Sequence, residues 1–209
     1  MRVLAVLLLS ALLLPGTTPA AAEPNATDAT VAAIAARVEQ PELLRGRFEQ
    51  DKEIAGFSKP LRSQGQFVLA RGRGVIWQTE HPFPSRLTVT AKRLRARSGD
   101  SVRELDADSE PALRAINALL FDVLAGNVTQ LQDRFKVDVA QIDEHGWHLR
   151  LLPKAGMFAQ VFTAIELDGD RSIERIALDE AIGDHSEIRF SAQARTPALS
   201  TEESADLAD

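Results

Sequence analysis

Apolar and polar residues alternate with a period of two along much of this 209-residue chain, and no other feature restricts its fold as strongly. The first such stretch spans 44–49, where Leu44, Gly46 and Phe48 alternate with charged residues. This period places successive side chains on opposite faces of a strand, so it is typical of a half-buried strand. Strand patterns recur at 67–70, 75–77, 87–89, 147–151, 161–167, 176–178 and 188–192. The chain is therefore predicted to form a meander of antiparallel strands that curves around an interior.

Two segments follow helical spacing instead. Apolar residues at 31, 34, 35 and 38 recur every three to four positions, and Pro41 stops the pattern. A second helix is expected to begin at Ser109, which can cap it, and to end at Gly126. These helices are the only predicted elements that are free to cover the sheet. The predicted fold class is therefore mainly β with a helical lid, an α+β arrangement.

The first 22 residues are typical of a secretory signal peptide. Arg2 gives a positive start, residues 3–14 are almost entirely apolar, and residues 20–22 are small alanines that suit a signal peptidase. No later run is apolar enough to span a bilayer, and no cysteine near residue 23 could accept a lipid anchor. We expect a signal peptide at 1–22, one soluble periplasmic domain at 23–196, and a disordered acidic tail at 197–209.

Composition excludes several classes of protein. Removal of Arg2 with the signal peptide leaves 23 basic and 30 acidic residues, a net charge of −7. This charge disfavours nucleic acid and anionic membrane surfaces as partners. The chain has no cysteine, which excludes disulfides, thiol nucleophiles and zinc–thiolate sites. Tyrosine is absent and aliphatic residues dominate the predicted inward faces, which suits contact with acyl chains better than stacking on sugars or bases.

Neither a catalytic nor a metal site can be recognised in the sequence. His145 and His148 lie close together, but no third ligand follows at a suitable spacing. His81 and His185 fall in predicted loops, and the chain lacks a Gly-x-Ser-x-Gly motif. We therefore expect no enzymatic activity, no metal ion and no cofactor.

A series of motifs gives the chain a family resemblance. Residues 48–50 read Phe-Glu-Gln, residues 65–71 contain Gly-x-Phe-x-Leu-x-Arg, and Trp77 and His81-Pro82 follow. The C-terminal half adds the segments 147–154 and 162–169, the latter ending in Asp-Gly. In this order and spacing the chain resembles the LolA family of periplasmic outer-membrane lipoprotein carriers over most of its predicted mature length.

The resemblance implies a strongly curved, unclosed antiparallel β-barrel of about eleven strands covered by helices. It also implies a carrier that takes the acyl chains of lipoproteins from an inner-membrane release complex and passes them to an outer-membrane receptor. A monomer is expected. Two alternatives stay open: a carrier of another acylated product, such as a glycolipid or a lipophilic pigment precursor, and a protein-interaction module of the envelope.

Arg71 is the residue that the resemblance connects with the lid. In the family an arginine at the end of a strand holds the lid closed by hydrogen bonds to lid backbone, and Arg71 occupies the matching position. A guanidinium carries several donors in a fixed fork, which suits helix-end carbonyls. A solvated strand-end arginine is the alternative. The chain departs from the family at Gly72, where proline is usual, and at Val75, where an aromatic residue is usual.

The interior of such a barrel is predicted to hold apolar cargo. If the lid packs its own side chains against the wall, cargo must displace them, and binding stays reversible. An ordinary filled core is the alternative interpretation for each of these side chains. The predicted cleft consists of Ile34, Phe48, Phe67, Leu69, Val75, Trp77, Leu87, Val89, Leu120, Phe121, Trp147, Leu149 and Leu151.

Overall fold

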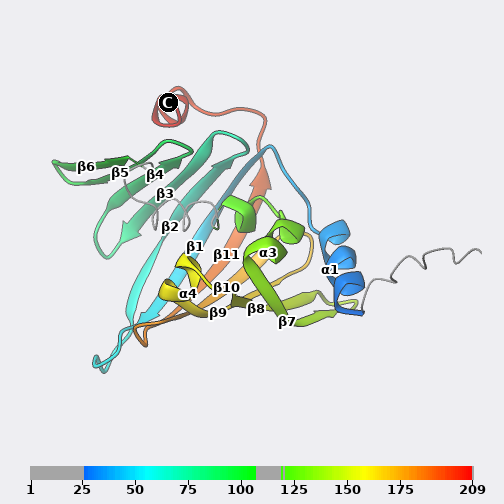
Figure 1. Cartoon of the computed structure of the whole chain (residues 1–209). Helices are drawn as coiled ribbons and strands as arrows, with labels where there is room; N and C mark the ends of the chain where they lie inside the picture. Colours follow the sequence, from blue (N-terminus) through cyan, green and yellow to red (C-terminus); the bar gives the residue numbers. More distant parts are fainter. Residues whose placement is uncertain (1–25, 107–118, 120, 209) are drawn as a thin grey trace, which may run out of the picture.

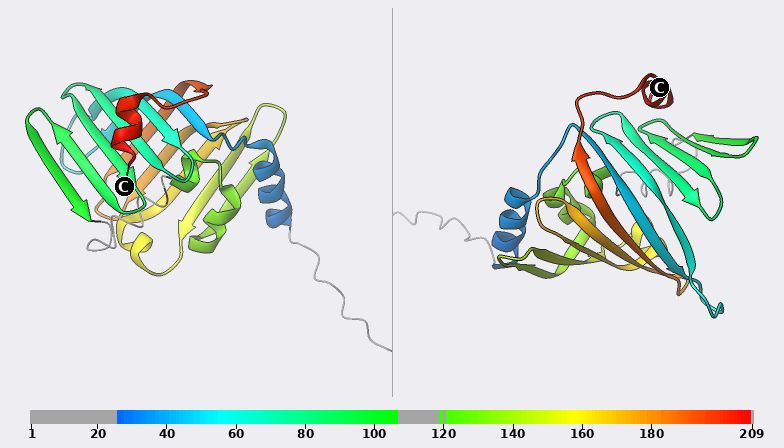
Figure 2. Two further views of the ribbon diagram at one scale, coloured as in Figure 1. Left: turned by 90° about the horizontal axis from the view of Figure 1, so that it is seen from above. Right: turned by 180° about the vertical axis from the view of Figure 1, so that it is seen from behind.

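The computed structural model describes residues 26–106, 119 and 121–208, and their strands form one antiparallel sheet (Figure 1). Its eleven strands follow the order β6-β5-β4-β3-β2-β1-β11-β10-β9-β8-β7. Because β6 and β7 lie at opposite edges, the sheet stays open, and Figure 2 shows that it is strongly curved. The predicted unclosed sheet of about eleven strands is thus confirmed. The strands are β1 (Leu43–Glu53), β2 (Leu61–Ala70), β3 (Gly74–His81), β4 (Ser85–Thr90), β5 (Arg93–Ser98), β6 (Ser101–Asp106), β7 (Phe135–Ile142), β8 (Trp147–Pro153), β9 (Phe162–Gly169), β10 (Ile173–Glu180) and β11 (His185–Arg195).

The first and last strands join the two halves of the sheet. Every other strand pairs with a neighbour in sequence, whereas β1 pairs with β11 along a register that places Phe48 opposite Phe190. On its other side β1 pairs with β2, where Phe48 lies opposite Gly65. The wing formed by β1–β6 and the wing formed by β7–β11 therefore meet at these two strands.

Helices cover the concave side. The first is α1 (Ala26–Arg37), which ends before Pro41 as its apolar spacing predicts. Residues 121–124 are also helical, and α3 (Val128–Arg134) follows; the short α4 (Met157–Val161) connects β8 to β9. In Figure 1, α3 lies in front of the sheet and α1 lies at its β7 edge. Residues 109–118 and Leu120, which belong to the second predicted helix, lie outside the described residues.

The C-terminal segment corrects the prediction of a disordered tail at 197–209. It contains α5 (Thr201–Asp206), which begins with a reciprocal capping box between Ser200 and Glu203. Leu207 follows the helix and is only 3% exposed, because it enters an apolar patch on the outer face of the sheet. The patch consists of Leu43, Val68, Ala70 and Ile76. The prediction of disorder is wrong for residues 197–208, because their composition does not reveal the surface that the sheet supplies.

Candidate functional site

Aromatic side chains line the concave face where the two wings meet. Phe48 stacks on Trp77 with ring centroids 3.9 Å apart, and Phe67 meets Phe190 edge to face at 5.4 Å. Gly46 makes this packing feasible, because a Cβ atom there would lie 2.5 Å from the Phe67 ring. Phe48, Phe67 and Trp77 therefore form one aromatic wall with Phe190 of β11, and this wall includes strands of both wings.

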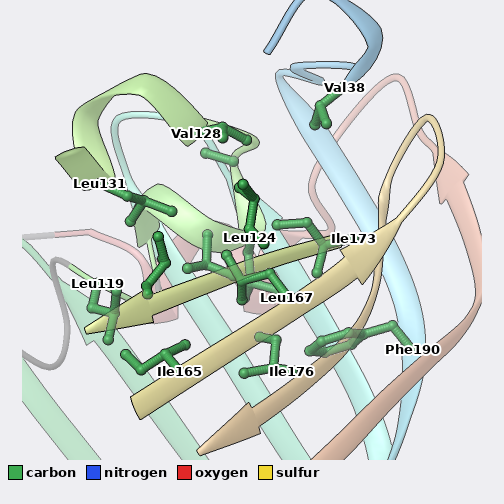
Figure 3. Close-up of a cluster of buried hydrophobic side chains, with 14 of the residues drawn as sticks. Val38, Leu119, Leu124, Val128, Leu131, Ile165, Leu167, Ile173, Ile176 and Phe190 are labelled. Atoms are coloured by element: carbon green, nitrogen blue, oxygen red, sulfur yellow. The ribbon is translucent and has the colours of Figure 1, made fainter. Parts of the chain in front are cut away.

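Side chains of the lid pack onto this wall and onto the adjacent strands. Figure 3 shows Leu124, Val128 and Leu131 of the lid directed toward Ile165 and Leu167 of β9. All five belong to one buried apolar cluster. Burial of each such side chain contributes roughly 1.5–3 kcal/mol, so the closed lid is a substantial part of the core.

The protein's own side chains fill the interior. Ile34, Leu69 and Leu167 have no exposed surface. A cavity of ≈ 170 Å³ lies where α1 leads into β1, with Val38 and Leu124 in its lining. Pockets that hold small molecules usually measure about 300 Å³ or more, so this cavity is too small for an acyl chain. This cavity would have to widen to admit an acyl chain.

The helix of residues 121–124 ends in a Schellman motif. The N–H of Gly126 donates to the Val123 carbonyl at 3.1 Å, and the N–H of Asn127 donates to the Asp122 carbonyl at 2.7 Å. Gly126 has a φ of 73°, a conformation that glycine adopts without strain. The motif leaves the Ala125 carbonyl at the helix end available for a donor from outside the helix.

Arg71 supplies that donor. Its Nη2 donates to the Ala125 carbonyl at 2.9 Å, and its Nη1 donates to Oδ1 of Asn127 at 3.4 Å. The guanidinium also lies 3.7 Å from a carboxylate oxygen of Glu42. Arg71 follows the last residue of β2, so it connects the end of a wall strand to the C-terminal end of a lid helix.

The turn that carries Arg71 presents its two arginines to opposite faces of the sheet. Arg71 reaches the lid on the concave side, whereas Nη2 of Arg73 donates to the Ser204 carbonyl of α5 at 3.2 Å on the outer side. Gly72 between them has a φ of 69°. Substitution of Arg71 and substitution of Arg73 therefore test the lid contact and the outer-face contact separately.

Further ion pairs hold the lid at the same end of the sheet. Nε of Arg171 donates to Glu39 at 2.7 Å, and Arg195 also pairs with this carboxylate. The hydrogen bond from Arg171, and next the one from Arg195, hold the pKa of Glu39 below its ordinary value. Arg134 of α3 pairs with Asp122. Ion pairs thus connect the segment between α1 and β1 to the sheet, and a further ion pair connects α3 to the helix of residues 121–124.

The sequence model described as "Outer membrane lipoprotein carrier protein LolA" matches residues 39–203, which include all eleven strands and the lid residues 119 and 121–134, but not α1. The chain belongs to this family. No curated protein matches it by sequence.

Solved structures similar to this LolA-family chain share little sequence with it. A LolA superfamily protein from Nitrosomonas europaea has 8% identity and a TM-score of 0.46, covering 83% of this chain and 94% of that one. A DUF1329 family protein from Desulfovibrio piger has 11% identity and a TM-score of 0.48, covering 87% and 99%. The lipoprotein LppX of Mycobacterium tuberculosis has 10% identity and a TM-score of 0.41, covering 83% and 99%. The family assignment therefore rests on the sequence match.

Most of the predicted cleft residues meet in a single cluster on the concave side of this LolA-family sheet. Val89, which is buried, and Leu87, which is half-buried, lie on β4 opposite Val75 and Trp77. Leu120 lies outside the described residues. The residues of the cluster are Ile34, Phe48, Phe67, Leu69, Val75, Trp77, Phe121, Trp147, Leu149 and Leu151.

The sequence prediction missed other parts of this cluster. Phe190 closes the aromatic wall, although the alternation at 188–192 already placed it on a strand. The remaining large contributors lie on the lid and on β7, β9 and β10. They include Leu124, Val128, Leu131, Phe135, Phe162, Ile165, Leu167, Ile173 and Ile176. Their apolar character indicated burial, but only the pairing of the strands brings these side chains together in one interior.

Histidines on β8 and β11 pair with carboxylates. His81 and His185 were expected in loops, but His81 is the last residue of β3 and His185 is the first residue of β11. Nδ1 of His148 lies 2.7 Å from Oδ1 of Asp168, and Nδ1 of His185 lies 2.8 Å from Oδ1 of Asp179. Within residues 26–106, 119 and 121–208, no group of three or more His, Asp or Glu residues is arranged to hold a metal ion. None of the helices in this part of the chain is long and apolar enough to cross a membrane.

Proposed function

We propose that this chain is a periplasmic carrier that shelters the acyl chains of lipoproteins in its concave side and shuttles them from the inner toward the outer membrane. The observation that carries the proposal is the bridge from Arg71 to the Ala125 carbonyl, which connects a wall strand to a lid over an apolar interior. Residues 1–22 direct export, and the carrier works as a monomer that makes and breaks no covalent bonds in its cargo.

Reversible transfer requires moderate affinity. Each buried methylene contributes about 0.8 kcal/mol, so a fully sheltered acyl chain would bind too tightly to be released. Entry of cargo must displace lid side chains such as Ile34 and Leu131, which are fully buried without cargo. The net binding free energy is then the difference between the contacts that the wall makes with the acyl chain and those that it makes with the lid. This difference is small enough for release.

Arg71 sets how often the lid opens. The guanidinium is about one quarter exposed, so its hydrogen bond to Ala125 contributes about 1 kcal/mol rather than the larger value of a fully buried charged pair. Loss of this bond raises the population of the open lid and with it the apparent affinity for acyl chains, by about five- to tenfold. The same loss slows release to an acceptor.

The test compares three forms of the full chain, exported through its own N-terminus and purified without detergent. Wild type, Arg71→Leu and Arg73→Leu are analysed by native mass spectrometry and by lipid mass spectrometry of extracts. We expect co-purifying lipoprotein or acyl species, with more retained by Arg71→Leu than by wild type. Arg73→Leu is the matched control, because Arg73 contacts α5 on the outer face, and it should retain as much as wild type.

Two results would contradict the proposal. An apo-protein that also fails to take up a fluorescent acyl probe would exclude an acyl-binding interior. Equal retention by Arg71→Leu and Arg73→Leu would exclude Arg71 as the lid bond.

A further inference from the structure

Large apolar side chains stand exposed on three turns of the described chain. Phe57 is 71% exposed, Leu61 58%, Phe83 78% and Ile182 74%. Phe57 belongs to the β1–β2 connection, and Leu61 is the first residue of β2 directly after it. Phe83 belongs to the β3–β4 turn and Ile182 to the β10–β11 turn. Turns are usually polar, and exposed apolar side chains that gather on one part of a surface mark an interaction site.

The three turns share one end of the sheet. Leu61 pairs with Lys52 at the end of β1, and the same end of β1 pairs with the start of β11, where Glu53 lies opposite His185. Gln64 near the start of β2 pairs with His81 at the end of β3. Figures 1 and 2 show the β1–β2 connection projecting beyond the sheet with the β10–β11 turn beside it. The Arg71 turn lies at the opposite end of β2.

Hydrogen bonds hold these turns in place. The N–H of Phe57 donates to the Ile54 carbonyl at 2.9 Å. The buried carboxylate of Asp184 accepts from the N–H of Ala55 at 3.0 Å, which joins the β10–β11 turn to the β1–β2 connection. The β1–β2 connection and the β10–β11 turn therefore present their apolar side chains from a hydrogen-bonded backbone. In the part of the chain that the structure describes, these side chains remain exposed.

The charge of the tips favours a lipid surface over water. Residues 54–61, 82–84 and 181–183 contain Lys59 and no carboxylate. Lys52 lies 2.5 Å from Glu180 and 3.4 Å from Asp184, so its one positive charge compensates one of these two carboxylates behind the tips. The exposed carboxylate of Glu53 balances Lys59, so the tip region with the groups behind it keeps a net charge of about −1. The net charge of the whole chain thus does not describe this end of the molecule.

We propose that this end of the sheet, with Phe57, Leu61, Phe83 and Ile182 at its tips, docks on the surface of a lipid bilayer. Aromatic and aliphatic side chains on projecting turns enter the region between headgroups and acyl chains, and Lys59 stays at headgroup level. A fluid surface accommodates tips of different height, whereas a protein partner would require a matching groove for each. The small negative charge of this end does not attract anionic lipid, so a zwitterionic bilayer is the expected surface. It does not depend on acyl binding in the interior.

The test uses sedimentation of the full exported chain with sonicated phosphatidylcholine vesicles. Wild type is expected to sediment with them at 0.15 M and at 0.5 M NaCl. The double variant Phe57→Ser/Phe83→Ser should bind at least about tenfold more weakly, because it loses two inserted rings. The matched control Phe57→Leu/Phe83→Leu keeps apolar side chains at both tips and should retain most of the binding. Both substitutions change exposed positions, so unfolding curves should coincide with that of wild type.

A label on the tips gives a second measurement. The chain has no cysteine, so Ser58→Cys carries an environment-sensitive fluorophore on the β1–β2 connection, and Ala91→Cys carries it at the opposite end of the strands. Addition of vesicles should shift the emission at position 58 to shorter wavelength and leave position 91 unchanged. Absence of wild-type binding, equal binding by the serine double variant, loss of binding at 0.5 M NaCl, or a shift at position 91 alone would each overturn the proposal. Acyl-probe uptake by the serine double variant separates failure of docking from failure of the carrier function.

Discussion

The two wings of the sheet share one apolar interior but have different outer faces. On β1–β3 the outer face has an apolar patch that the C-terminal segment covers, and Leu207 of this segment joins Val68 and Ile76 in one cluster. On β7–β11 the outer face carries ion pairs and stays open to water. The comparison teaches that a half-buried sheet can protect its second face either with an added layer or with charge.

The covered wing depends on a close fit. A Cβ atom at Gly74 would lie 2.5 Å from Cδ2 of Leu207, so the glycine makes room for this side chain. Arg45 of β1 pairs with Glu203 at 2.5 Å, and Arg86 of β4 pairs with Asp206 at 2.6 Å. Leu207 thus packs into the apolar patch on the outer face, and the two ion pairs hold α5 against the sheet.

The open wing has a ladder of charges that crosses its strands. Arg175 of β10 lies 2.7 Å from Asp168 of β9 and 2.8 Å from Glu187 of β11. Arg150 of β8 lies 2.6 Å from Asp138 of β7. These groups are partly exposed, so each pair contributes little, and together they keep the strands in register and the face soluble.

The largest effect is expected at Leu207. Replacement by alanine leaves a cavity over the apolar patch and should lower the free energy of unfolding by about 2–3 kcal/mol. Urea denaturation measures the change. The matched control Leu61→Ala removes an exposed leucine and should stay within about 0.5 kcal/mol of wild type. A loss at Leu207 as small as that of the control would show that α5 is not stably docked.

A smaller effect is expected at Arg175. Arg175→Met retains much of the side-chain volume but removes the ladder pairs, and should cost about 1 kcal/mol or less. The difference from wild type should shrink in 1 M NaCl because salt screens partly exposed charges, whereas the effect of Leu207→Ala should persist. Urea denaturation at both salt concentrations checks this. The proposed difference between the wings would be wrong if Arg175→Met lowered the free energy of unfolding more than Leu207→Ala. It would also be wrong if salt left the effect of Arg175→Met unchanged.

The smallest effect is expected at Glu203. Burial raises the pKa of this carboxyl, but hydrogen bonds from Arg45 and from the Ser200 backbone outweigh it, and the net pKa lies below its ordinary value of 4.5. The ionised group thus stabilises the fold above about pH 4.5, and this contribution is lost as the pH falls through the lowered pKa. Glu203→Gln should be less stable than wild type by about 0.5 kcal/mol at pH 7, and the difference should be smaller at pH 3. Denaturation curves at the two pH values give the answer; a constant difference would exclude this carboxylate as the source.

The alternation of apolar and polar residues predicted most strands, but not all of them. It did not predict β5 and β6, which lie at one edge of the sheet; on β5 only Leu94 is buried. It also did not predict β7, where a bulge between Val137 and Val139 interrupts the period of two. A strand is recognisable from sequence only when one of its faces is apolar over several regular steps.

The motifs of the predicted site gave the residues but not their contacts. Phe48, Phe67 and Trp77 were assigned to the interior from their strand pattern, and they share the aromatic wall. Their partner Phe190 comes from the other end of the chain, and no local pattern connects it with them. In the same way, the small and acidic composition of the tail concealed Leu207.

By itself the sequence determined most of the strands and their faces, the end of α1 before Pro41 and the helix end at Gly126, because periodicity and capping act over a few residues. Only the tertiary structure decided the contact of Arg71 with Ala125, 54 residues apart, and of Arg73 with Ser204, 131 residues apart. It also decided that Phe57 and Phe83 remain exposed at one end. Such placements depend on strand register and on the curvature of the whole sheet, which no short segment encodes.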